Sequence, residues 1–299
     1  MQFRRRKRRQ TFRQELNDLV RATAGGFLFG IPLLYTMEVW WIGSLVTPLM
    51  MVGAIAATLL VVFTLTLTAG FRQQRATTPV AALGDTFNAI AVGLLSAALM
   101  LVLLREITWQ TQLRETLGKI IFEGVPFALG AGLANQFLTA SDNGNVPSES
   151  NGFSASKALN RFFPANNLNE TLADIGATLV GALIIAFSIA PTEEVPMLVG
   201  GIQGPRLLGI ILASLVISYM IVFQANFTSQ SQRQMQRGLF QSPLSETIMS
   251  YLVSLMAATI MLGFFQQISL ATPWHVAFRH ILVLGLPATI GGAAGRLAL

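Results

Sequence analysis

Long apolar stretches, each near the length needed to cross a lipid bilayer, constrain this chain more than any other feature of its sequence. A spanning helix needs about 20 mostly apolar residues. Eight stretches approach or exceed that length, at residues 22–39, 44–69, 80–104, 119–138, 171–190, 207–227, 244–265 and 278–297. They are continuous and lack the alternation of polar and apolar residues that a membrane β-barrel requires. The sequence therefore predicts an all-α membrane protein with about eight transmembrane helices.

The composition supports this fold class and narrows the chemistry. Only 11% of the residues are charged, whereas soluble domains carry about 25%. The chain has no cysteine and two histidines, which excludes disulfides, thiolate metal sites and cysteine nucleophiles. No sequence pattern typical of a soluble enzyme is present. We therefore expect no enzymatic activity, no cofactor and no bound metal ion.

The distribution of positive charge predicts the orientation in the membrane. Eight of the 20 Lys and Arg residues lie in the first 21 positions. When eight spans are threaded with the N-terminus inside, 15 cations, Arg296 among them, fall on the inner side and five on the outer side. Cytoplasmic loops of membrane proteins carry an excess of Lys and Arg. Both termini are therefore expected in the cytoplasm.

The N-terminal basic run, Arg4–Arg9, has two interpretations. Such a run can bind nucleic acid, or it can hold the chain against anionic lipid headgroups. The apolar stretches that follow favour the lipid bilayer as the partner, so no nucleic acid is expected. Small residues spaced four apart, as in Gly26 and Gly30, mark close helix packing, which leaves a homo-oligomer open.

The chain divides into four segments. A basic N-terminus covers residues 1–21, and a four-helix membrane segment covers residues 22–138. A turn-rich cytoplasmic linker covers residues 139–170, in which residues 153–163 are compatible with a short helix on the inner surface. A second four-helix segment covers residues 171–299.

The two membrane segments resemble each other in sequence. A shift of 161 residues aligns eight identities within residues 83–107, and it places Gly124 and Pro126 on Gly285 and Pro287. Matched Gly and Pro carry more weight than matched apolar residues, because each fixes a backbone feature. A shift of 156 aligns Gly25 with Gly181 near the start of each segment.

These matches predict an internal duplication of a four-helix unit. An even number of spans returns the chain to the side on which it started, so the two copies are expected to be parallel. If one helix of each copy were re-entrant, the copies would instead be inverted.

Acidic residues in or near the spans are the candidate functional residues, because a charge at mid-bilayer costs at least about 2.5–3.5 kcal/mol. The duplication pairs Asp85 with Glu246 and Glu38 with Glu194. Paired carboxylates can share protons or hold a cation. The alternative is that Asp85 and Glu246 cap their own helices, and that Glu38 and Glu194 lie in water at the outer boundary.

Four further residues are secondary candidates. Glu123, about four residues into the fourth span, follows Lys119 at the spacing of a helical ion pair. Glu193 belongs to an acidic turn between two prolines, where it could attract cations or be solvated. Asp174 opens the fifth span and is expected at the interface. His280, near the start of the eighth span, is expected to reach outward and is a weaker candidate for a proton sensor.

The basic N-terminus, the Pro191–Val195 turn and the Leu83–Thr86 segment resemble a family of bacterial integral membrane proteins of cyanobacterial and rhizobial type. The resemblance would span nearly the whole chain. It implies a location in the bacterial inner membrane and no assigned activity, so it carries over no functional residues.

Two hypotheses for function follow from these observations. The first is a transporter or channel for protons or small cations, with a path between the two repeats lined by Asp85, Glu246, Glu38 and Glu194. The second is a membrane scaffold, partner subunit or lipid-binding protein that transports nothing. Neither the substrate nor the gating can be read from the sequence.

Overall fold

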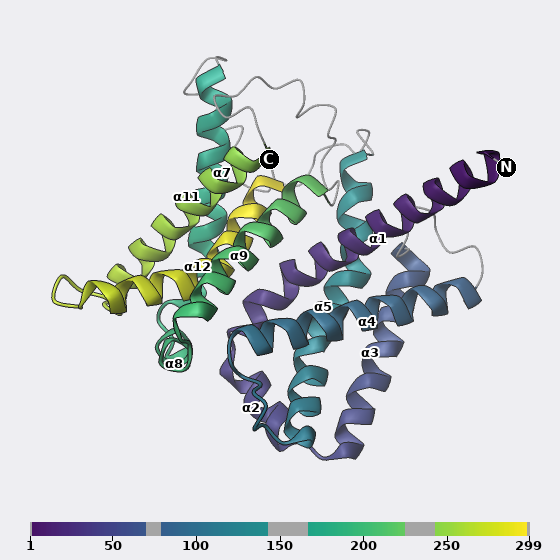
Figure 1. The fold of residues 1–299 in the computed structure, drawn as a ribbon, viewed down its shortest axis with the longest axis horizontal. Coiled ribbons are helices and arrows are strands. Elements are labelled where there is room, and N and C mark those ends of the chain that lie inside the picture. The colour runs from purple at the N-terminus through teal and green to yellow at the C-terminus, as the bar shows by residue number, and fades with distance from the viewer. Residues whose placement is uncertain (1, 70–78, 143–166, 225–242, 298–299) are drawn as a thin grey trace. The chain divides into compact units, whose positions relative to one another are not determined.

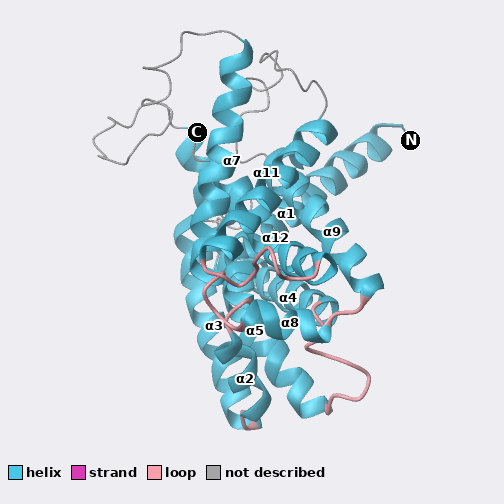
Figure 2. Ribbon diagram, turned by 90° about the vertical axis from the view of Figure 1, so that its left-hand side faces the viewer, coloured by secondary structure: helices cyan, strands magenta, loops and turns pink. Residues whose placement is uncertain are grey.

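The computed structural model describes residues 2–69, 79–142, 167–224 and 243–297. All secondary structure in these ranges is helical (Figure 2). The chain folds as two units. Unit 1 comprises residues 1–101, 108–140 and 224–226, and unit 2 comprises residues 102–107, 141–223 and 227–299. Residues 153–163, expected as a short surface helix, lie outside the described ranges.

The described part of unit 1 holds five helices, drawn from purple to teal in Figure 1: α1 (Gln2–Leu34), α2 (Met37–Leu45), α3 (Pro48–Ala69), α4 (Pro79–Leu103) and α5 (Leu113–Asp142). Unit 2 holds α7 (Asn167–Ile189), α8 (Glu194–Gly201), α9 (Gly204–Tyr219), a π-helical turn (Met220–Gln224), α11 (Pro243–Phe264) and α12 (Trp274–Leu297).

Six described helices are long and apolar enough to cross a membrane, and two bent helix pairs raise the number to eight if each pair is one span. Helices satisfy all their backbone hydrogen bonds internally, which is why continuous apolar sequence folds this way in lipid. Each of the eight predicted stretches falls on one of these helices or pairs. A multi-pass integral membrane protein is therefore confirmed, with six to eight spans.

The bent pairs differ from the straight spans expected at the start of each unit. The segment from Glu15 to Leu34 and α2 meet at 87°, and so do the segment from Asp174 to Ile189 and α8. At each bend a threonine hydroxyl donates to a carbonyl one turn back, Thr36 to Leu33 and Thr192 to Ile189. The backbone amide of the same threonine donates to the same carbonyl, so each helix end is closed by two hydrogen bonds. The short helices α2 and α8 were not foreseen.

Small side chains bring the helices of unit 1 together. Ala22 of α1, Val62 of α3, Ala89 of α4 and Ala128 of α5 belong to one buried apolar cluster. The ring of Phe27 meets the ring of Phe127 edge to face, with centroids 5.8 Å apart. Without a hydrophobic driving force in lipid, such close van der Waals packing is what holds spanning helices together.

Helix α12 is the centre of unit 2. It packs against α7, α8, α9 and α11, and its residues from Leu282 to Ala293 are buried without interruption. Glycines make this possible: a Cβ atom at Gly181 of α7 would overlap the carbonyl oxygen of Gly291 in α12. The backbones of α7 and α12 therefore touch directly.

The starts of α4 and α11 lie one residue before the predicted ones, and they test the interpretation of Asp85 and Glu246 as helix caps. Helix α4 begins at Pro79, so Asp85 lies almost two turns inside it. Helix α11 begins at Pro243, which places Glu246 within its first turn. The interpretation of Asp85 as a helix cap is therefore wrong, since a cap must precede the helix. Glu246 does lie where a negative charge favours the helix dipole.

Candidate functional site

One face of α5 carries charge from the surface of unit 1 into its core. Glu115, Lys119 and Glu123 are spaced four residues apart, which aligns them on one side of the helix. The exposed fraction of the side chain falls from 35% at Glu115 to 10% at Lys119, and Glu123 is 0% exposed. We call these three residues the α5 charged face.

Glu123 lies at the midpoint of its span. The sequence pattern placed it about four residues inside, but the helix begins at Leu113, and the candidate span runs from Leu113 to Ala134. Residues 113–118, which are too polar to be recognised as part of a membrane helix from the sequence, form the first turns of α5. A carboxyl group thus reaches the middle of a membrane span in the centre of unit 1, which makes Glu123 a functional candidate.

Lys119 links the surface to the buried end of this face. Its ammonium group lies 2.9 Å from the Glu115 carboxylate, one turn nearer the surface. The sequence suggested Glu123 as its partner, and the spacing places Lys119 between the two acids. Because Lys119 is buried, the charge of Glu115 helps to offset the cost of removing its ammonium group from water.

A second polar group lies near the start of α4. Asp85 is buried, and the hydroxyl of its neighbour Thr86 lies 3.0 Å from the hydroxyl of Thr66 on α3. On α1, the buried Arg21 lies 3.5 Å from Asp18. Unit 1 therefore buries ionisable groups on α1, α4 and α5.

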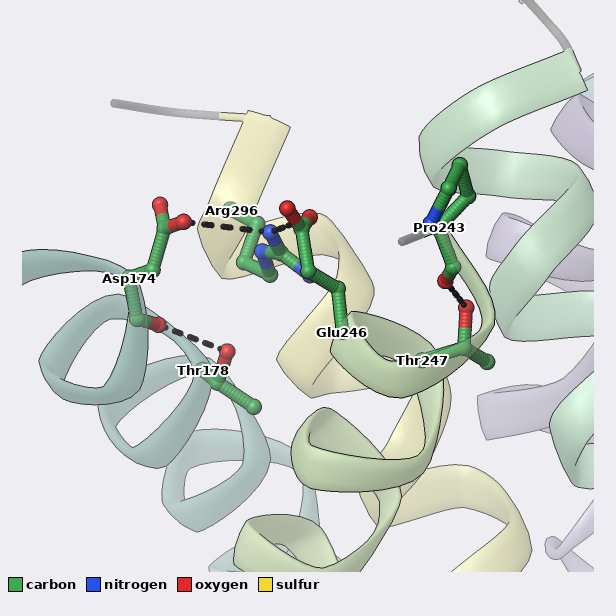
Figure 3. A network of polar contacts seen from close by, with 6 residues as sticks. All are labelled: Asp174, Thr178, Pro243, Glu246, Thr247 and Arg296. Carbon is green, nitrogen blue, oxygen red and sulfur yellow. Dashed lines mark hydrogen bonds and ion pairs between the residues drawn. The ribbon is translucent and has the colours of Figure 1, made fainter. Parts of the chain in front are cut away.

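In unit 2, Arg296 joins three helices. Its Nη2 atom donates to Asp174 of α7 at 3.2 Å and to Glu246 of α11 at 2.9 Å (Figure 3). Arg296 itself is 1% exposed, whereas the two carboxylates remain partly in contact with the surface. The ring of Phe223, on the π-helical turn, lies 5.9 Å from the guanidinium carbon. We call Asp174, Glu246 and Arg296 the arginine cluster.

The arginine cluster changes the assignment of three residues. Asp174, expected at the interface, retains partial exposure and also binds Arg296. Glu246, expected to pair with Asp85 or to cap a helix, binds the same arginine. Arg296 was expected as a cation of the inner side and was missed as a partner. The glycines at positions 291 and 295 could have indicated this role, because they allow the last turn of α12, which carries Arg296, to pack closely against α7.

The acids at the bends divide into exposed and buried residues. Glu38 and Glu193 are exposed, as expected for groups at a water boundary. Glu194, in the first turn of α8, is buried, and its Oε2 atom accepts no hydrogen bond from the described residues. The interpretation of Glu194 as a solvated boundary residue is therefore wrong.

His280 is buried in α12 rather than reaching outward. Its Nδ1 atom lies 2.9 Å from the carbonyl oxygen of Val276, one turn earlier in the same helix. The expectation that it extends to the interface is wrong: α12 begins at Trp274, so His280 lies almost two turns inside the helix, and its side chain is buried. Its proposed role as a proton sensor stays a prediction.

Hydroxyl groups in unit 2 mostly bond back to their own helices. Those of Thr178, Ser214, Ser254 and Thr289 each donate to the carbonyl oxygen four residues earlier. Bonds of this kind satisfy a buried hydroxyl without a partner helix. Unit 2 therefore uses much of its buried polarity within single helices and in the arginine cluster.

The predicted pairing of acids across the two repeats stays a prediction. Asp85 and Glu38 belong to unit 1, while Glu246 and Glu194 belong to unit 2. Among the described residues, no group of three or more His, Cys, Asp or Glu side chains could hold a metal ion.

Comparison with known proteins gives the family of the chain. No curated protein and no solved structure matches it. A family model of integral membrane proteins matches residues 18–299, which includes all the described helices except the first part of α1. This agrees with the sequence resemblance to a family of integral membrane proteins and with the spans of the structure. The chain belongs to the DUF2391 family of integral membrane proteins.

Proposed function

We propose that the protein transports protons or small cations across the membrane, with Glu123 as the central exchange site. The observation that carries this proposal is a fully buried carboxyl group at the midpoint of a span. A charge at that depth is costly, so an ionisable group there is a candidate for exchanging a proton or a cation. A group that can hold and release a proton halfway across the bilayer is what a proton relay requires.

The α5 charged face supplies access to this site. If the N-terminus is cytoplasmic, α5 begins at the outer surface. Glu115 then takes up a proton or cation near that surface, and Lys119 lies one turn above Glu123. A buried ammonium group beside the route excludes bare cations by repulsion more strongly than it hinders a proton relay. Protons are therefore the favoured substrate, with Na⁺ and K⁺ as the cations to test.

Toward the inner end of unit 1, Asp85 and the Thr66–Thr86 hydroxyl pair supply further buried polar groups. This route differs from the one expected between the repeats, because it runs along the helices of one unit. Glu38, exposed in α2, would remain outside it.

The test is proton flux into liposomes that contain the purified protein and an internal pH-sensitive dye. A K⁺ diffusion potential set by valinomycin drives the protons inward. We expect the native protein to acidify the interior, Glu123→Gln to abolish the flux and Glu123→Asp to retain part of it. Glutamine has the same shape without the proton, so the fold should persist, and the thermal midpoint of unfolding checks this.

Glu15→Gln is the matched control, since Glu15 is exposed on α1 and distant in sequence from α5. Its flux should equal that of the native protein. The proposal fails if the native protein moves neither protons nor Na⁺ nor K⁺, or if folded Glu123→Gln keeps the native flux.

A non-transporting scaffold or partner subunit is the second candidate, and the arginine cluster favours it. In unit 2, Arg296 neutralises Asp174 and Glu246 and so holds α7, α11 and α12 together. Glu194, the other principal acidic candidate in this unit, is buried. If flux is absent, this structural use of charge would extend to unit 1. The absence of enzymatic activity and the bacterial inner membrane as location belong to both proposals.

We also infer that the two units arose from one four-helix ancestor. Several contacts recur at the same offsets as the sequence matches. Gly25 meets Gly130 in unit 1 as Gly181 meets Gly291 in unit 2. A Cβ at Gly124 would strike the side chain of Leu94, and one at Gly285, 161 residues later, would strike Leu255.

The two copies have diverged where the proposal places function. The position of Lys119 holds His280 in unit 2, again basic and buried, but the position of Glu123 holds Leu284. Unit 2 therefore keeps the basic residue and lacks the central acid. This difference supports a single exchange site in unit 1. The parallel arrangement of the copies follows from four spans in each and is tested below.

A further inference from the structure

Two loops of the chain, residues 104–112 and 265–273, have the same backbone design. They join α4 to α5 and α11 to α12, and they lie 161 residues apart in the sequence. Each contains a residue with positive φ, Arg105 at 69° and Gln266 at 58°. These are non-glycine residues in a region that side chains rarely adopt. The same local geometry is thus imposed twice on different sequences.

A doubly closed turn follows in each loop. The amide of Thr111 donates to the carbonyl of Thr108 at 3.1 Å, and the amide of Thr108 donates to the Thr111 hydroxyl at 3.0 Å. The amide of Thr272 donates to the carbonyl of Ser269 at 3.0 Å, and the amide of Ser269 donates to the Thr272 hydroxyl at 2.9 Å. Two hydrogen bonds in each loop therefore fix the residues at its tip, 109–110 in the first loop and 270–271 in the second.

Each fixed tip presents a large apolar side chain. Trp109 and Leu270 occupy the same position of the two turns and are fully exposed. Four residues later, at the first residue of the next helix, Leu113 and Trp274 also match in position and are largely exposed. Each loop, together with the start of the helix that follows it, thus carries one tryptophan and one leucine. The tryptophan comes first in one case and the leucine comes first in the other. A turn in water favours polar residues, Gly or Pro at its centre, so a solvated loop does not explain this choice.

The helices that lead into the two loops also expose apolar side chains. Leu95 and Leu99 are exposed along α4 toward the first loop, and Ile260 and Phe264 are exposed along α11 toward the second. These side chains lie on helices that cross the bilayer, so their exposed faces meet lipid. The loop residues extend this surface by about one turn beyond the helix end.

We propose that the two loops are membrane anchors, which insert their paired Trp and Leu side chains into the headgroup region of the outer leaflet. Tryptophan is enriched at this level of the bilayer, because its ring is apolar and its N–H can still bond to water or headgroups. The hydrogen-bonded turns hold the side chains outward in advance. Two anchors of one design would fix the depth of α5 and α12, the two helices that begin at these loops.

The partner is the lipid of the outer leaflet, and depth-dependent fluorescence quenching tests it. The chain has four tryptophans. Two variants keep one each, Trp109 or Trp274, with the other three replaced by phenylalanine. Each is reconstituted into phosphatidylcholine vesicles that carry bromine either near the headgroup or near the end of the acyl chain.

We expect the tryptophan emission of both variants to lie at a shorter wavelength than that of a tryptophan fully exposed to water. We expect stronger quenching by bromine near the headgroup than by bromine at the chain end. Acrylamide in the water should quench them weakly. The matched control is Gln110→Trp in a chain with all four native tryptophans replaced by phenylalanine, which places the ring at the next position of the same turn. Acrylamide should quench the fluorescence of this variant more strongly.

The proposal is overturned if Trp109 and Trp274 are quenched fully by acrylamide and by neither brominated lipid, which would mean that the loops lie in water. It is equally overturned if neither kind of quencher acts, which would mean that another protein or a second copy covers the tips. This test does not depend on proton flux.

Discussion

Arg296 joins α7, α11 and α12 through two carboxylates, and it is the residue whose loss should affect unit 2 most. Replacing it with glutamine leaves Asp174 and Glu246 close together without a counter-charge. Removing one partner of a buried ion pair costs about 3–5 kcal/mol. Because the two acids are partly exposed to water, we expect about 2–3 kcal/mol. The thermal midpoint in detergent should fall accordingly.

Arg279→Gln on the same helix is the control, because Arg279 forms no ion pair with an acid among the described residues and lies near the exposed end of α12. Its midpoint should stay near the native value. A triple variant, Arg296→Met with Asp174→Leu and Glu246→Met, should recover most of the lost stability, since no unpaired charge remains. If Arg296→Gln melts like the native protein, the arginine cluster does not stabilise unit 2.

At the scale of the helices, the contact between α7 and α12 depends on the absence of side chains. A methyl group at Gly181 would overlap the carbonyl oxygen of Gly291, which is backbone and cannot rotate away. Added atoms in a tight core cost about 1–3 kcal/mol, and a clash with backbone belongs at the upper end of that range. Gly181→Ala should therefore lower the thermal midpoint of the protein.

Gly263→Ala in α11 is the matched control, because a Cβ there meets nothing within 4 Å. Alanine favours a helix over glycine by about 1 kcal/mol, so this variant should be as stable as the native protein or slightly more so. Equal midpoints for the two variants would show that α7 and α12 are not in direct backbone contact.

At the scale of the whole molecule, the parallel arrangement of the two copies predicts on which side each loop lies. The chain has no cysteine, so each introduced cysteine is the single site for a membrane-impermeant maleimide. Gln110→Cys and Ala271→Cys, both exposed at the loop tips, should be labelled in intact cells. Ser148→Cys in the linker should be labelled after the membrane is opened.

The pattern of labelling distinguishes three arrangements. Labelling of positions 110 and 271 from the same outer side supports parallel copies. Labelling of these two positions from opposite sides would mean that the copies are inverted, with one re-entrant helix in each. Labelling of position 148 in intact cells would reverse the orientation derived from the positive charges.

The sequence by itself determined the fold class, because lipid leaves no solution for long apolar stretches other than helices with internal hydrogen bonds. It also placed the spans within a few residues and identified the matched glycines and prolines, since these residues act through local backbone geometry. Asp85, Glu123, Glu246 and His280 could be recognised as unusual because charge is costly in a membrane. None of these inferences requires knowledge of which helices touch.

The tertiary structure decided which of these residues have partners and how deep they lie. Arg296 binds acids that are 50 and 122 residues away in the chain, a distance over which no sequence periodicity operates. Glu123 became central because α5 begins at Leu113, six residues before its predicted apolar stretch. At the bends, the hydroxyls of Thr36 and Thr192 donate to carbonyls of the preceding helix. Burial and pairing arise from packing between helices, and that is why only the folded chain reveals them.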